Sequence, residues 1–140
     1  MVEEVIVELG LSAQESRLQT ESGNPAWGLM KGSAQVFVFV NPGTGDEECN
    51  SIQVVAPVII IPEAASSQTA LFRHLLDLNA REIAGAAFGL KGETVVVTVD
   101  RSTLDLDRSE VKDMVLRVGY YADTFDDALV SQFGGRRHAD

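Results

Sequence analysis

Two segments of the chain, residues 34–40 and 52–61, carry apolar side chains on both faces of a predicted strand. Successive side chains of a strand point to opposite faces, so a strand with one face in water alternates apolar and polar residues. Here the even-numbered positions are apolar throughout, and the odd-numbered positions add Phe37, Phe39, Val55 and Ile59. The pattern predicts that the even-numbered face is the core face, under helices, and that the odd-numbered face needs a cover of its own.

Pro57 interrupts the second of these segments. Proline has no backbone N–H to donate to a neighbouring strand, so it occurs at sheet edges and at β-bulges. A bulge inserts one extra residue into a strand and can exchange its two faces beyond that point. We therefore expect any exchange of the two faces to begin at Pro57.

The remaining segments complete an α+β pattern. Apolar residues spaced three and four apart predict helices at residues 2–9, at residues 70–79 and over a stretch of about 25 residues, or about 38 Å, that begins after Asp107. Further strands are predicted at residues 26–30, 84–90 and 93–99, and Val96 adds an apolar side chain to the outward face of the last one. The order α-β-β-β-α-β-β-α indicates an antiparallel sheet with helices.

The C-terminal helix has the clearest start signal. Asp107 can accept a hydrogen bond from the backbone of the first turn, and Glu110 can bond back to the backbone of residue 107. Leu106 can pack on Val111 across the start of the helix. The two carboxylates, together with Asp105, lack the glycine turn and the ligand spacing of a calcium loop, so a helix cap explains them better than a metal site.

The composition is that of one folded domain. The 140 residues are 45% hydrophobic and 23% charged, which is enough for a core without disulfides. We expect a single domain over residues 1–135 and a flexible tail over residues 136–140, led by a Gly-Gly pair. Cys49 is the single cysteine and lies in an acidic loop, so no intramolecular disulfide can form.

Charge and hydropathy narrow the range of partners. Eleven basic and 21 acidic residues give a net charge of −10, which repels phosphate backbones and predicts no binding to nucleic acid. The apolar runs stop well short of the roughly 20 residues that span a bilayer, which predicts no membrane association. The acidic start, Met-Val-Glu-Glu, is unlike a signal peptide, and we expect a cytoplasmic protein.

Few residues could carry catalysis. His74 lies on a predicted helix without a nucleophile motif, and His138 lies in the predicted tail. The glycine-rich loop at residues 41–45 is followed by acidic residues, not by the lysine and helix of a phosphate site. Asp123, Asp126 and Asp127 are typical of a solvated helix face. The sequence therefore predicts no enzyme activity, no cofactor and no metal.

The second apolar face has two explanations. Helices on opposite sides of the sheet would give a fully covered monomer, but the N-terminal helix is only about two turns long. Alternatively, a second copy or a protein client covers this face. The contact residues would then be Phe37, Phe39, Val55, Ile59 and Val96.

Another class of function is a small-ligand sensor or minor enzyme. Its pocket would lie between the sheet and the C-terminal helix, near Trp27, Tyr120 and Tyr121. Neighbouring positions on a helix point about 100° apart, so one of the two tyrosines at most would line such a pocket. This is the weaker of the two hypotheses.

Three segments resemble a known protein family. They read "LFRHLLDLNA" at residues 71–80, "GAAFGLKGETVVVTVDRSTLDLD" at residues 85–107 and "LVSQFGG" at residues 129–135. They are similar to the bacterial YbjN family and, more distantly, to the type III secretion chaperones, and the similarity extends from Trp27 to Gly135. The resemblance implies a secretion-chaperone-like fold, a homodimer, no enzyme activity and a chaperone-like or regulatory role.

Overall fold

The computed structural model describes residues 1–43 and 50–138. Cys49, the second half of the glycine-rich loop and residues 139–140 of the predicted tail lie outside the described residues. The helices are α1 (Val2–Glu8), α2 (Ala13–Ser16), α3 (Ala65–Arg81) and α4 (Arg108–Phe133). The strands are β1 (Ala26–Lys31), β2 (Ala34–Asn41), β3 (Ser51–Ile60), β4 (Ala87–Lys91), β5 (Thr94–Ser102) and β6 (Arg136–Arg137).

The described strands form one antiparallel sheet. β1, β2, β3, β5 and β4 lie side by side in that order, and β6 pairs with β3. The predicted α+β class is therefore confirmed, and the eight predicted elements are present in the predicted order. The structure adds two short elements, the single turn of α2 and the two-residue strand β6.

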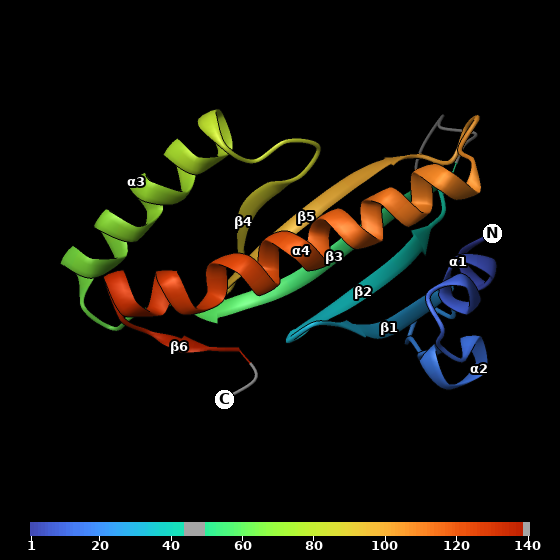
Figure 1. The fold of residues 1–140 in the computed structure, drawn as a ribbon, viewed down its shortest axis with the longest axis horizontal. Coiled ribbons are helices and arrows are strands. Elements are labelled where there is room, and N and C mark those ends of the chain that lie inside the picture. Colours follow the sequence, from blue (N-terminus) through green and yellow to red (C-terminus); the bar gives the residue numbers. More distant parts are fainter. Residues whose placement is uncertain (44–49, 139–140) are drawn as a thin grey trace.

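The long helix α4 runs along one face of the sheet (Figure 1). α1 packs near its start and α3 near its end. Side chains of all three helices share one core with side chains from one face of the sheet, as Val5, Leu75, Val118 and Val38 illustrate. The helices thus build a single apolar layer on the face that the sequence predicts as the core face.

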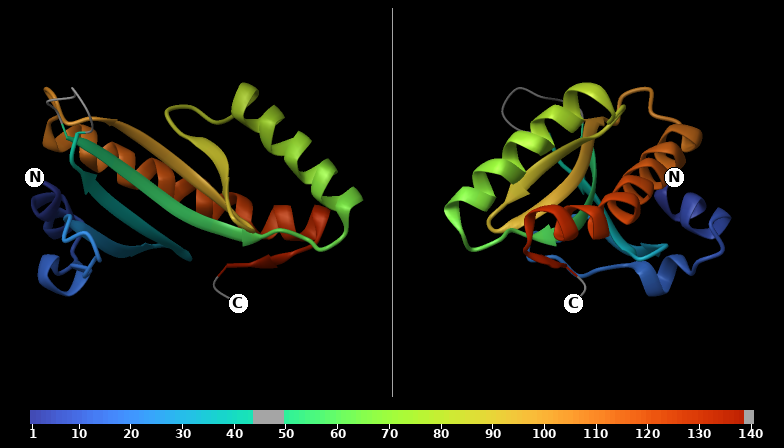
Figure 2. Two further views of the ribbon diagram at one scale, coloured as in Figure 1. Left: turned by 180° about the vertical axis from the view of Figure 1, so that it is seen from behind. Right: turned by 60° about the vertical axis from the view of Figure 1, so that its left-hand side comes forward.

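The opposite face of the sheet, called the outer face below, is not covered by helices. Seen from behind, the strands lie in front of α4, and none of the helices in the described part of the chain crosses them (Figure 2). α1 and α3 do not lie on opposite faces, because both contribute to the same core as α4. The first explanation of the second apolar face, with helices on opposite sides of the sheet, is therefore wrong.

The alternation of faces holds along β2 and along β3 as far as Pro57. Val36, Val38 and Val54 are fully buried in the core. The pairing of β3 with β5 then shifts between Pro57 and Ile59, which is the irregularity that Pro57 predicted. Beyond the shift Ile59 pairs with Val95, is fully buried and belongs to the core. The assignment of Ile59 to the outer face is therefore corrected, because the bulge turns its side chain inward.

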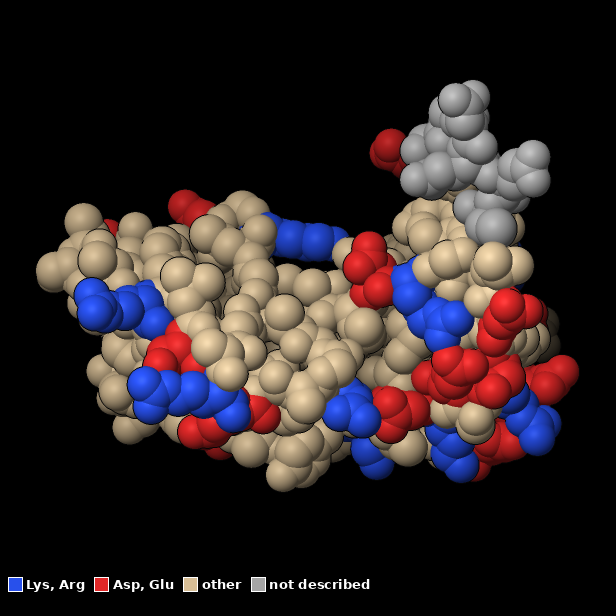
Figure 3. Space-filling view, turned by 90° about the horizontal axis from the view of Figure 1, so that it is seen from above, with Lys and Arg blue, Asp and Glu red and all other residues tan. Residues whose placement is uncertain are grey.

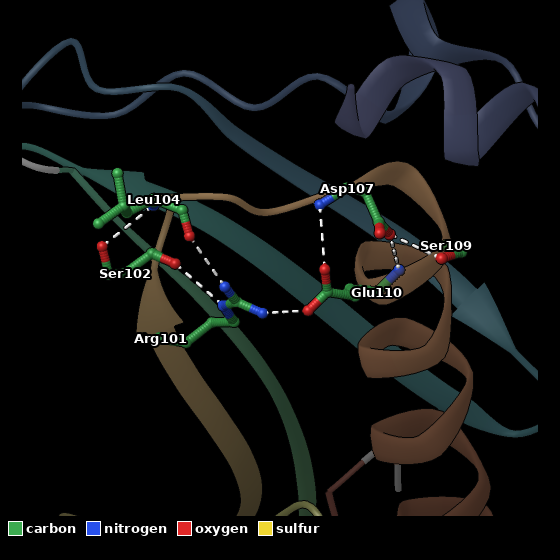
Figure 4. A network of polar contacts seen from close by, with 6 residues as sticks. All are labelled: Arg101, Ser102, Leu104, Asp107, Ser109 and Glu110. Atoms are coloured by element: carbon green, nitrogen blue, oxygen red, sulfur yellow. Dashed lines mark hydrogen bonds and ion pairs between the residues drawn. The ribbon is translucent and has the colours of Figure 1, made fainter.

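The start of α4 has the predicted capping box and is joined to the end of β5 (Figure 4). Asp107 Oδ1 accepts a hydrogen bond from Glu110 N at 2.9 Å, and Glu110 Oε1 accepts one from Asp107 N at 3.3 Å. The other oxygen of Glu110 pairs with Arg101 Nη1, and Arg101 also donates to the carbonyls of Ser102 and Leu104 at 3.0 Å. One carboxylate therefore caps the helix and ties it to the preceding strand.

Charged side chains of both signs gather at the end of the molecule where α1 meets α4, whereas the middle of the same view is largely uncharged (Figure 3). Arg108 pairs with Glu4 at 3.4 Å and with Glu8 at 3.2 Å, and Lys112 lies 3.7 Å from Glu8. Exposed pairs of this kind contribute little to stability, about 0–1 kcal/mol each. In the part of the chain described here, no helix has the length and apolar character needed to cross a membrane.

Candidate functional site

The centre of the outer face is a pair of aromatic rings on β2. Phe37 and Phe39 are both half-buried, and their ring centroids lie 6.3 Å apart with planes inclined by 21°. Both residues have odd numbers and therefore point away from α4. The sheet thus presents two neighbouring aromatic side chains on the face that lacks helices.

Aliphatic side chains on the neighbouring strands extend the aromatic pair. Val55 lies directly across from Phe37, and Val96 lies one strand further along, paired with Pro57. Each valine is 4% exposed, although neither belongs to the core under α4. The two valines are thus buried on the outer face, whereas Phe37 and Phe39 remain partly accessible to a partner.

A glycine shapes the edge of this surface. Gly28 lies across from Phe37 in β1, and a Cβ atom at Gly28 would lie 3.3 Å from the Phe37 ring and 3.5 Å from a methyl group of Leu18. The ring therefore lies over the bare backbone of β1, with Leu18 beside it. Neither residue was predicted as part of this surface, and the glycine inside a predicted strand was the available signal. We call Leu18, Phe37, Phe39, Val55 and Val96 the outer patch.

Polar groups border the outer patch. Gln53 lies across from Phe39, and its amide donates to the hydroxyl of Thr98 on β5 at 3.4 Å. Gln35 and Asp100 are exposed on the same face further out. An apolar centre with aromatic side chains and a polar rim is the composition of a protein-binding surface.

A second cluster joins α4, the β1–β2 turn and β6. Asp126 lies within the apolar stripe of α4, between Ala122 and Leu129, and is 7% exposed. Its carboxylate accepts a hydrogen bond from Ser33 Oγ at 3.2 Å and lies 3.5 Å from Arg137 Nη2. The assignment of Asp126 to a solvated face is therefore wrong, and its place within an apolar stripe was the signal that could have revealed it.

The neighbouring carboxylate of Asp123 holds the same turn. Asp123 Oδ1 accepts hydrogen bonds from the side chain of Ser33 and, at 3.0 Å, from its backbone N–H. These two hydrogen bonds lower the pKa of the Asp123 carboxyl below its usual range. The β1–β2 turn is thus anchored to α4 by two acidic side chains that recognise one serine.

The residues considered for a ligand pocket have separate roles in the structure. Trp27 is a core residue, with the Arg17 guanidinium 4.9 Å from its ring centroid. Tyr120 is exposed, whereas the hydroxyl of Tyr121 accepts a hydrogen bond from Ala84 N at 3.2 Å. Structural roles account for Trp27 and Tyr121, so we base no function on a pocket at these residues.

The two histidines of the chain contact neighbouring groups in the structure. The ring of His74 lies against Phe133, with the centroids 5.1 Å apart. The backbone N–H of His138 donates to the carbonyl of Val58 at 3.2 Å. Over residues 1–43 and 50–138, no group of three or more His, Cys, Asp or Glu side chains is arranged to hold a metal ion.

Comparison with known proteins matches this architecture to a family. The family model TY-Chap1, described as "T3SS (YopN, CesT) and YbjN peptide-binding chaperone 1", matches residues 1–140. The chain belongs to the TY-Chap1 family. The resemblance to YbjN proteins and to type III secretion chaperones is therefore confirmed.

A solved structure supports the same fold for this TY-Chap1 member. A chain in the crystal structure of the ExsC–ExsE complex superposes with a TM-score of 0.56 at 17% sequence identity. The match covers 91% of this chain and 90% of that chain. A comparison with curated protein sequences finds no match. Family membership makes this chain a module of the peptide-binding chaperone class, and at 17% identity the structural match speaks for the fold alone.

Proposed function

We propose that this TY-Chap1 member is a non-enzymatic, homodimeric chaperone module that uses the outer patch to bind a second copy or an extended segment of a protein client. The observation that carries the proposal is the Phe37–Phe39 pair on a sheet face without helices. Aromatic side chains that are desolvated together commonly supply much of the energy of a protein interface.

The shape of the outer patch supports an extended partner. Phe37 and Phe39 lie along one strand, and Val55 and Val96 on the neighbouring strands are buried, so the accessible apolar surface is narrow and follows β2. A segment that contributes alternate apolar side chains could cover both rings while its other side chains remain in water. Ile59 has no part in this contact, because it belongs to the core.

Two further observations support a protein partner. The family description names peptide binding, and the superposed solved chain comes from a two-protein complex. The net charge of −10 disfavours nucleic acid. We place the module in the cytoplasm, in keeping with the single cysteine of the sequence.

The test is Phe39→Asp, which introduces a charge on the outer patch, with Asn41→Asp as the matched control. Both positions have odd numbers in β2, and the control adds the same charge but leaves both rings in place. Light scattering measures the mass in solution, and affinity capture from the native cell with mass spectrometry measures partner binding. Circular dichroism confirms that each variant is folded.

We expect Phe39→Asp to lose either the dimer or the captured client, and Asn41→Asp to retain both. Loss of the dimer with the client retained would assign the outer patch to self-association, and the reverse would assign it to the client. An unchanged dimer that still captures its partners would contradict the proposal.

A further inference from the structure

The C-terminal residues take up a strand position that β2 leaves open. β2 pairs with β3 from Asn41–Ser51 as far as Phe37–Val55 and then separates from it. β6 joins β3 beyond this gap, with Arg137 across from Ile59 and Arg136 across from Ile60. Residues 136–138, predicted as part of a flexible tail, are therefore paired with the sheet. We call residues 134–138 the clasp.

The clasp is fitted closely to β3 at its first residues. Gly134 and Gly135 have φ values of 86° and 83°, a backbone conformation that residues with a side chain rarely adopt. A Cβ atom at Gly135 would lie 2.3 Å from the carbonyl oxygen of Ile60, so a side chain cannot be accommodated there without displacing the clasp. The Gly-Gly pair is therefore what allows the chain to turn back from α4 and meet β3.

The far end of the clasp, residues 136–138, is held by ion pairs of Arg137, by its pairing with β3 and by a hydrogen bond from His138 N to Val58 O at 3.2 Å. Arg137 lies 3.5 Å from Asp126 and 3.4 Å from Asp127, and the clasp contributes two paired residues to the ladder. Among the described residues, the buried Nε of Arg137 has no hydrogen-bond partner. A buried polar group without a partner costs free energy, which weakens the binding of the clasp to β3.

Hollows lie at both ends of β6. One of about 350 Å³ opens between the β1–β2 turn and β3, with Gln35, Pro57 and Asp126 among its lining residues. The other, of about 630 Å³, lies at the end of β3 and is lined in part by Glu63, Glu93 and Arg136. Open space thus continues beyond β6 at both of its ends, and acidic side chains line each of the two hollows.

Building on the proposed peptide-binding function, we propose that this edge of β3 is a docking site for an extended basic peptide, and that the clasp occupies it until such a peptide displaces it. An incoming strand would pair with Val58–Ile60 through its backbone, as β6 does. Its arginine or lysine side chains would meet Asp126 and Asp127, which Arg137 now neutralises, and Glu63 and Glu93 beside Arg136. A longer strand would also fill both hollows.

The test compares the full chain with two variants that open the site. One lacks residues 134–140, and the other is Gly135→Ala, which keeps the full length but blocks docking of the clasp. Gly23→Ala is the matched control, because Gly23 also has a positive φ, of 75°, but a Cβ there meets nothing within 4 Å. The probes are two labelled peptides, one of alternating arginine and valine and one of alternating glutamate and valine, and fluorescence anisotropy measures their binding.

We expect the arginine–valine peptide to bind the deleted chain at least about tenfold more tightly than the full chain, as for a clasp that is closed in about nine molecules of ten. Gly135→Ala should shift the affinity in the same direction, and Gly23→Ala should leave it unchanged. Asp126→Asn in the deleted chain should weaken binding, and the glutamate–valine peptide should not bind. Equal affinity for the full chain and both opened variants, or equal binding of the two peptides, would overturn the proposal.

A further variant separates this inference from the proposed function. Phe39 pairs with Gln53, away from the Val58–Ile60 edge, so Phe39→Asp in the deleted chain should leave the affinity for the arginine–valine peptide unchanged. If the peptide does not bind while Phe39→Asp abolishes dimer formation or client capture, the clasp site is wrong and the proposed function remains. Loss of peptide binding in Phe39→Asp would show that the peptide occupies the outer patch and would overturn the clasp site.

Discussion

The side-chain amide of Asn79 on α3 bonds both backbone groups of Phe88 on β4. Phe88 N donates to Asn79 Oδ1 at 2.7 Å, and Asn79 Nδ2 donates to Phe88 O at 3.2 Å. β4 is the last strand on its side of the sheet, and these backbone groups bond α3 instead of β5. Unpaired groups on an edge strand attract strands of other molecules, and Asn79 satisfies one such pair.

We predict that Asn79→Ala lowers the free energy of unfolding by about 1–3 kcal/mol, because both backbone groups of Phe88 lose their partner. Urea unfolding measures the loss, and turbidity on standing measures edge-to-edge association. Asn79→Asp retains an acceptor for Phe88 N but places a carboxylate against Phe88 O, so it should not restore stability. Ser66→Ala, at an exposed position of the same helix, is the control. A variant as stable as the wild type would show that water replaces the amide without loss.

The two faces of the sheet predict different effects for two apolar residues, Ile59 of β3 and Phe39 of β2. Ile59→Ala removes a fully buried core side chain and should cost about 2–5 kcal/mol. Phe39→Ala removes a half-buried ring from the outer face. It should lower the free energy of unfolding less than Ile59→Ala does, but weaken partner binding more. Urea unfolding and the capture assay measure the two effects. Similar destabilisation by both substitutions would contradict the assignment of faces.

Gly119 allows α4 to approach the sheet closely. A Cβ atom there would lie 2.7 Å from the side chain of Lys31 and 3.3 Å from that of Val36. Gly119→Leu should therefore force the helix away from β2 and lower the free energy of unfolding by about 1–3 kcal/mol. Ala128→Leu, at an exposed position of the same helix, should leave stability nearly unchanged. Thermal unfolding compares the two variants, and equal melting temperatures would argue against a close approach at Gly119.

Stability should fall in acid because two carboxyls have lowered pKa values. Hydrogen bonds from the Ser109 side chain and the Glu110 backbone lower the pKa of Asp107, and those from the Ser33 side chain and backbone lower the pKa of Asp123. The unfolded state then binds protons more readily than the folded state. This contribution is present above the unfolded pKa of about 3.9 and is lost as the pH falls through the lower folded values.

Ser33→Ala tests the pH dependence at Asp123. Without the hydroxyl, the pKa of Asp123 should rise towards its usual range, and stability should depend less on pH between about pH 5 and pH 2. Asp123→Asn should reduce the dependence further, because no carboxyl remains to titrate. Urea unfolding at a series of pH values gives the slopes. A slope for Ser33→Ala equal to that of the wild type would contradict this account.

Much of the fold could be predicted because its signals are local. The alternation in β2 and the capping pair at Asp107 and Glu110 each depend on residues within a few positions of one another. The start of α3 was predicted five residues late, at residue 70, because its first turn is mostly exposed and has no apolar periodicity. Gln68 instead holds this turn by donating to the carbonyl of Pro62 at 2.8 Å.

The parts that could not be predicted depend on residues far apart in the chain. β6 forms because β2 leaves an edge of β3 open, which the sequence of residues 136–138 alone does not indicate. The roles of Asp126 and Arg137 likewise follow from their meeting with each other and with Ser33. The position of the bulge at Pro57 could be predicted from the sequence. The face that Ile59 takes beyond it could not, because that depends on the pairing with β5.

Site-specific photo-crosslinking tests the central claim, that the outer patch binds a polypeptide, most directly. A photoreactive amino acid replaces Phe39 in one protein and Tyr120 in another, since Tyr120 is an exposed residue of α4. After irradiation in the native cell, gel electrophoresis and mass spectrometry identify the adducts. We predict discrete adducts with a second copy or a client at position 39, and only background at position 120. Adducts at position 120 with none at position 39 would contradict the account.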